Sequence, residues 1–153
     1  MVRRIIGALI AVAFTIAVPA VAAATRPAAG HQAVKTVHVK YTLIGAQVGS
    51  NENVYDVRGP VHGAAIQFIK ENSAGTGGTY TGTTYNGLGT LVSAGTFTNS
   101  PPDTHGIITI NGGGHWVRGT GVYKHVRGKF TVSGTLNANN GHLKIVLVGT
   151  ETY

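Results

Sequence analysis

One short segment of the chain combines two carboxylates with side chains that could assist them in acid–base chemistry. The segment holds Glu52, Tyr55, Asp56, Arg58 and His62. A carboxylate whose pKa is raised by burial can act as a general acid or base beside a tyrosine and a histidine. The same residues would also suit a solvated loop with a local ion pair, and this alternative stays open. Glu52 and Asp56 are therefore candidate catalytic residues.

A second cluster, in residues 115–129, is rich in basic and aromatic side chains. Arginine binds carboxylates through paired hydrogen bonds, and cations bind the faces of aromatic rings. The cluster could therefore hold a carboxylate ligand or an acidic polymer. Alternatively, its aromatic rings fill the interior of a sheet protein while its charges face water on alternate positions. The residues are His115, Trp116, Arg118, Tyr123, His125, Arg127 and Lys129.

Other kinds of site lack their sequence signatures. The chain contains no cysteine, which excludes disulfides, thiolate metal sites and cysteine nucleophiles. The seven histidines show neither H-x-H nor H-E-x-x-H spacing, and no serine lies in a G-x-S-x-G segment. We expect no metal site and no hydrolase of that type.

The elements that must position these residues are predicted to be strands. Glycine supplies 23 of 153 residues, and short β-branched runs alternate with Gly, Asn and Asp turns. The clearest run is 34–44, in which Val37, Val39, Tyr41 and Leu43 share one face. Residues 45–60 are expected to be irregular, and Gly112 to Gly114 to break a strand. The predicted strands are 34–44, 61–71, 79–85, 89–98, 105–111, 115–123, 129–136 and 143–150.

About eight strands suit a closed barrel, whose interior is filled by side chains or holds one small ligand. Closure would also remove the exposed strand edges, although the same pattern is compatible with a sandwich. We predict an all-β fold, an eight-stranded antiparallel β-barrel, over residues 34–153.

The N-terminus has the order of a secretory signal. Arg3 and Arg4 precede an uncharged, apolar stretch from Ile5 to Val18, and Pro19 and several alanines follow. We predict a signal peptide over 1–24 and a flexible leader over 25–33, although the stretch is also about long enough to span a membrane. The chain is therefore expected to be extracellular, with no stable membrane span after cleavage.

Charge gives a further constraint on partners. The formal net charge is +7, and the segment beyond residue 24 keeps ten basic against five acidic residues. The basic residues form no long run, so a nucleic-acid partner is not expected.

The run Gly119-Thr120-Gly121-Val122-Tyr123-Lys124-His125-Val126-Arg127-Gly128 resembles a segment of plant dirigent proteins, and more loosely of allene oxide cyclases. Val48-Gly49, Val54-Tyr55-Asp56 and Gly59-Pro60 are similar to the loop after the first dirigent strand. The resemblance implies an eight-stranded barrel with an apolar lumen, often a homotrimer, without metal or organic cofactor. It implies a role for Arg127. The carboxylates of the first strand and the cyclase cysteine of those families are absent here.

These observations lead to two expectations. In the first, the barrel binds a small hydrophobic molecule in its lumen and guides its cyclisation, isomerisation or stereoselective coupling. Arg127, Asp56 and Glu52 would be catalytic, and Tyr41, Tyr55, Trp116, Tyr123 and His125 would bind the ligand. In the second, a non-enzymatic extracellular or cell-envelope protein has a packed barrel and a basic surface that contacts polyanions or proteins. Whether the chain is an enzyme is left open.

Overall fold

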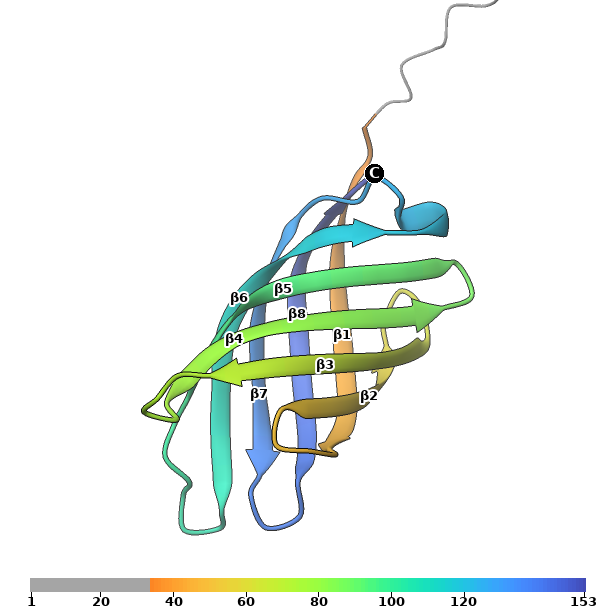
Figure 1. The fold of residues 1–153 in the computed structure, drawn as a ribbon. Coiled ribbons are helices and arrows are strands. Elements are labelled where there is room, and N and C mark those ends of the chain that lie inside the picture. Colours follow the sequence, from red (N-terminus) through yellow and green to blue (C-terminus); the bar gives the residue numbers. More distant parts are fainter. Residues whose placement is uncertain (1–33) are drawn as a thin grey trace, which may run out of the picture. The chain divides into compact units, whose positions relative to one another are not determined.

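The structure, a computed structural model, describes residues 34–153, which form a closed barrel of eight antiparallel strands (Figure 1). Each strand pairs with the next in sequence, and the last pairs with the first. The predicted signal peptide (1–24) and leader (25–33) lie outside the described residues. The strands are β1 (Thr36–Gln47), β2 (Glu52–Arg58), β3 (Gly63–Glu71), β4 (Gly77–Asn86), β5 (Gly89–Asn99), β6 (Ile107–Gly119), β7 (Lys129–Asn137) and β8 (His142–Thr152).

The alternation of side chains decides which residues face the lumen. On β1, Val39, Tyr41 and Leu43 are buried, whereas His38 and Lys40 between them are exposed. Successive residues of a strand point to opposite faces, so this pattern places the apolar set inside the barrel. The predicted barrel is confirmed, and the residues predicted to share one face of the first strand do so and face the lumen.

Two predicted segments were wrong. One strand was missed and one strand was divided into two, so the predicted number of strands is still eight. Residues 45–60, expected to be irregular, contain β2, whose Asn53, Tyr55 and Val57 are buried. Gly112 to Gly114, expected to break a strand, lie within the continuous strand β6. Pairing with β5 and β7 continues through these glycines, so their backbone hydrogen bonds are retained.

The two ends of the barrel differ. The end that carries the C-terminus also carries the short 3-10 helix η1 (Gly121–Tyr123), and the β5–β6 and β7–β8 loops lie at the opposite end (Figure 1). The residues expected to end the strand 115–123 thus belong partly to η1. Three residues of β6 or the connection that follows it are buried here, Trp116, Tyr123 and Val126. This end is filled by aromatic side chains.

Aromatic contacts hold this filled end together. The Trp116 ring meets Phe130 at 4.5 Å between centroids and Tyr41 edge-on at 6.1 Å. The indole nitrogen of Trp116 donates to the Thr150 carbonyl at 3.0 Å. Such offset and edge-to-face pairs add roughly 0.5–1.5 kcal/mol beyond area burial. None of the helical turns in residues 34–153 is long and apolar enough to cross a membrane.

Candidate functional site in the barrel lumen

The lumen contains a cavity of about 410 Å³. Inward-facing residues of all eight strands line it, and residues of the β3–β4 and β5–β6 loops form its mouth. Ligand pockets generally fall between about 300 and 1,000 Å³ and are mainly apolar. The apolar lining includes Leu43, Ala65, Ile69, Phe97, Ile108, Ile110, Trp116, Val132, Leu136, Leu143, Ile145 and Leu147.

A polar cluster interrupts this lining on β2 and β3. The Gln67 side-chain oxygen (Oε1) accepts a hydrogen bond from the Tyr55 hydroxyl at 2.8 Å and another from Asn53 Nδ2 at 3.1 Å. All three residues line the cavity, and Asn53 and Tyr55 are buried. Because buried polar groups require hydrogen-bonded partners, the three side chains stabilise one another on this wall.

Two further polar atoms on the lining are buried without a hydrogen-bond partner among the described residues. They are the Tyr80 hydroxyl and the Asn99 side-chain oxygen. A buried polar atom without a partner costs about 1–3 kcal/mol. Both atoms are fully buried, so they lie behind the surface that the cavity exposes.

Burial fixes the protonation state of the lumen tyrosines. Desolvation raises the pKa of Tyr55 well above its ordinary value, and the neighbouring Asn53 side chain opposes part of the shift. Desolvation also raises the pKa of Tyr80. Both hydroxyls therefore stay protonated at neutral pH and can donate hydrogen bonds.

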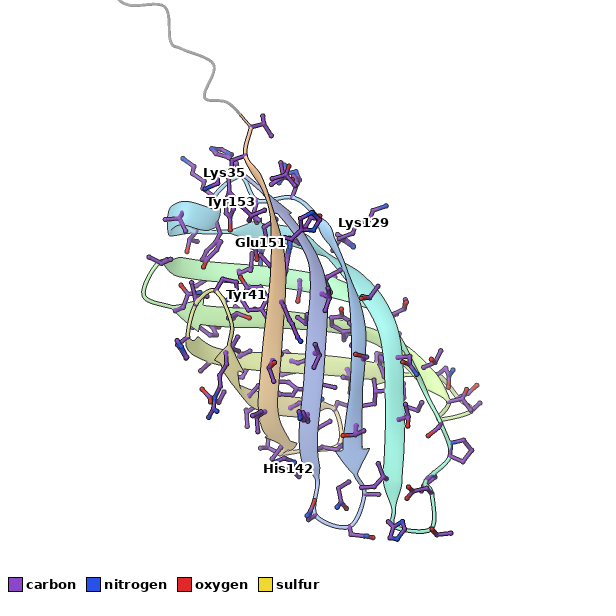
Figure 2. The ribbon with its side chains drawn as sticks, turned by 180° about the vertical axis from the view of Figure 1, so that it is seen from behind. Lys35, Tyr41, Lys129, His142, Glu151 and Tyr153 are labelled. Atoms are coloured by element: carbon purple, nitrogen blue, oxygen red, sulfur yellow. The ribbon has the colours of Figure 1, made fainter. Side chains whose placement is uncertain are left out.

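A second polar group lies at the filled end of the barrel, around Glu151 of β8. Glu151 is 1% exposed, and its side-chain oxygens accept one hydrogen bond from the Tyr41 hydroxyl at 2.8 Å and a second from the Tyr153 hydroxyl. Burial, followed by the hydrogen bond to Glu151, raises the pKa of Tyr41 and of Tyr153. Figure 2 shows the three residues together near the C-terminus, far from His142 at the other end.

The structure brings some predicted ligand-binding residues together and separates others. Tyr55 and Trp116 line the main cavity, and Tyr41 lies between Trp116 and Glu151 at the filled end. Tyr123 is buried there too, where its hydroxyl accepts a hydrogen bond from Asn86 Nδ2 at 3.3 Å. His125 is exposed and does not line the cavity.

The predicted catalytic residues do not line the cavity. Asp56 is on the outer face of β2, where its carboxylate pairs with Arg58 Nε at 2.8 Å and both side chains are more than half exposed. Glu52 begins β2 on the same outer face, opposite Phe68. The exposed Arg127 lies between η1 and β7, and its Nη1 donates to the Val126 carbonyl at 2.8 Å. A catalytic role for these three residues stays a prediction.

Sequence reasoning missed Asn53, Gln67, Tyr80, Asn99 and Glu151. Asn53 lay in the segment expected to be irregular. Glu151 lay just beyond the predicted end of the last strand. Strand alternation carried on from Leu143 and Ile145 to residue 151 would have placed that carboxylate inside.

No three His, Asp or Glu side chains within residues 34–153 are grouped so that they could hold a metal ion. Comparison of the chain with family models, curated proteins and solved structures gave no match, so nothing there identifies a dirigent or allene oxide cyclase-like family.

Proposed function

We propose that this protein binds a small, mainly hydrophobic molecule in the lumen of its barrel. The observation that supports the proposal is the cavity of about 410 Å³ with its largely apolar lining and a mouth between two loops. Burial of apolar ligand surface in such a cavity is favourable by about 25 cal/mol per Å².

The lining favours binding over acid–base catalysis. The ionisable side chains that line the described cavity are Tyr55, Tyr80 and Glu71. The two tyrosines have raised pKa values because they are buried, which makes them poor bases at neutral pH. Guidance of a cyclisation, isomerisation or coupling would then rest on the shape of the lumen.

The experiment is a fluorescence titration with N-phenyl-1-naphthylamine, a neutral apolar probe. Ala65 of β3 lines the cavity, so Ala65→Leu places three additional carbon atoms inside it. We expect the purified protein to bind the probe and Ala65→Leu to weaken binding about tenfold or more.

A neighbouring residue supplies the matched control. Ala64 precedes Ala65 on the same strand but is exposed on the outer face. Ala64→Leu should leave probe binding unchanged. Absence of probe binding to the unmodified protein, or equal weakening by both variants, would count against a lumen site.

We also propose that the chain is exported, because residues 1–24 have the order of a signal peptide. N-terminal sequencing of protein recovered from the culture medium should give a start near Ala22 to Ala24. An intact Met1 in the recovered protein would contradict cleavage. Native mass spectrometry of the same sample tests the homotrimer that the dirigent resemblance implies.

One observation favours the second expectation, contact with an anionic polymer. A shallow groove on the outside of the barrel lies over β3 to β6 and reaches the start of β7, with Lys70, His115 and Lys129 among its lining. The two lysines can attract anionic groups, and such attraction weakens with salt. Binding of an anionic polymer on the outer face would not require the lumen. Ala65→Leu should therefore weaken binding of N-phenyl-1-naphthylamine and leave binding of the polymer unchanged.

A further inference from the structure

We propose that the lumen selects an uncharged ligand whose polar head group both donates and accepts hydrogen bonds, such as a carboxamide, and discriminates against a carboxylate. The inference rests on the proposed lumen function and specifies its ligand class. It predicts where the head group lies, at Asn53 and Gln67, and where the hydrocarbon portion lies, against the opposite wall.

The hydrogen bonds of the polar cluster leave one donor group and one acceptor unused. Gln67 Oε1 accepts from both Tyr55 and Asn53, so the Gln67 amide is oriented with its Nε2 away from them. Neither Gln67 Nε2 nor Asn53 Oδ1 has a hydrogen-bond partner within residues 34–153. Neither atom is fully buried, and both residues line the cavity. Both atoms are therefore accessible to a molecule in the cavity. A carboxamide offers the complementary acceptor and donor.

The charge of the lining argues against an anionic head group. No lysine, arginine or histidine lines the described cavity, and its one carboxylate, Glu71, lies at the end of β3 near the mouth. A carboxylate that entered would lose its hydration without a cation to replace it, which is strongly unfavourable. It could also use the Gln67 donor but would repel the Asn53 oxygen.

The two walls of the lumen differ in polarity. In the order of the barrel, β7 lies four strands from β3 and β6 lies four strands from β2, so these strands face each other. The wall opposite the polar cluster is apolar, with Ile108 and Ile110 on β6 and Val132 and Leu136 on β7. A ligand with one polar edge and an alkyl body satisfies both walls.

The volume limits the ligand to a modest size. At about 30 Å³ for each water in the liquid, the cavity of about 410 Å³ corresponds to about fourteen waters. Octanamide and octanoate contain the same number of non-hydrogen atoms, which is below about fourteen, and they differ only in the head group. They form a matched pair of probes.

The experiment measures the affinity of each probe at neutral pH, where octanoate is ionised. The reporter is the emission of Trp116, the single tryptophan of the chain, which lines the cavity. We expect octanamide to bind at least about tenfold more tightly than octanoate, a difference of about 1.4 kcal/mol. Gln67→Leu should weaken octanamide binding about tenfold, whereas Ala64→Leu, on the outer face of the same strand, should leave octanamide binding and the preference unchanged.

The outcomes separate the inference from the proposed function. Equal or tighter binding of octanoate would overturn the neutral-ligand inference, as would binding of N-phenyl-1-naphthylamine with neither octyl probe bound. Absence of binding by all three probes would overturn the proposed function itself. If Gln67→Leu does not fold, the comparison of octanamide with octanoate on the unmodified protein still decides.

Discussion

Glu151 is buried beside hydrogen-bond donors but has no cationic partner. The only ion pair within residues 34–153 joins Arg58 to Asp56 on the outside of the barrel. Glu151 instead accepts hydrogen bonds from the Tyr41 and Tyr153 hydroxyls. Hydrogen bonds to charged groups contribute about 1.5–3 kcal/mol, so these donors stabilise an otherwise costly buried carboxylate.

We therefore expect Tyr41→Phe to destabilise the fold by about 1–3 kcal/mol, because it removes one of the two side-chain donors to Glu151. Urea denaturation followed by circular dichroism measures the loss. Tyr85→Phe is the matched control, since Tyr85 is 51% exposed and its hydroxyl makes no side-chain hydrogen bond within the described part of the chain. Equal stability of the two variants would contradict a stabilising role for the Tyr41 hydroxyl.

Only part of the candidate site could be predicted at the level of single residues. Tyr55 and Trp116 were expected to bind ligand because large aromatic side chains favour the interior. Gln67 and Asn53 gave no such signal, since amides are mostly exposed and the pairing that buries them joins β2 to β3. Arg127 matched the dirigent-like segment, but a motif does not specify the direction in which its side chain points.

One glycine of strand β6, Gly114, lies where neighbouring side chains and backbone leave no room for a Cβ atom. A Cβ atom at Gly114 would lie 2.3 Å from the Tyr80 hydroxyl and 2.7 Å from the Ala94 carbonyl oxygen. At the adjacent Gly113, the nearest atom would be the Phe130 carbonyl oxygen, at 3.2 Å. The inward glycine is thus required sterically, and the outward one much less.

Gly114→Ala should consequently destabilise the protein by roughly 1–3 kcal/mol through overpacking. Gly113→Ala should change stability by less than about 1 kcal/mol, since alanine also restricts the unfolded chain. Thermal unfolding of the two variants side by side measures the difference. A larger loss of stability for Gly113→Ala than for Gly114→Ala would contradict the steric requirement for glycine at position 114.

The same elements show why strand boundaries were only partly predictable. Gly112 to Gly114 suggested a break because glycine weakens an isolated strand, but pairing on both sides and the adjacent aromatic rings keep β6 continuous. Strand β2 was missed because Asn53 and Asp56 have low strand propensity. Both errors arise from contacts between strands that the local sequence does not contain.

At the scale of the whole molecule, buried phenols couple stability to alkaline pH. Burial raises the pKa of Tyr41, Tyr55, Tyr80, Tyr123 and Tyr153 above the ordinary value of 10.0. Above about pH 10 the unfolded chain releases these protons while the folded barrel retains them. The stabilisation is complete below about pH 10 and is lost as pH rises further.

We therefore expect the free energy of unfolding to fall steeply above about pH 10, by up to about 1.4 kcal/mol per pH unit for each tyrosine that stays protonated. Urea midpoints across this range give the slope, and phenolate absorbance shows whether ionisation accompanies unfolding. Tyr55→Phe and Tyr80→Phe should each make the dependence shallower. A free energy that stays constant well above about pH 10 would contradict the coupling.

The pairing of β1 with β8 also determines when the barrel can close as the chain is synthesised and folds. It joins the two strands most distant in sequence, and the Tyr41–Glu151 hydrogen bond spans 110 positions. Non-local pairing slows folding because the entropy of loop closure must be overcome before those contacts form. While a ribosome is still synthesising β8, β1 has no complete partner strand and the Tyr41–Glu151 hydrogen bond cannot form. We expect the barrel to form only after synthesis of its last strand, which leaves the nascent chain open until then.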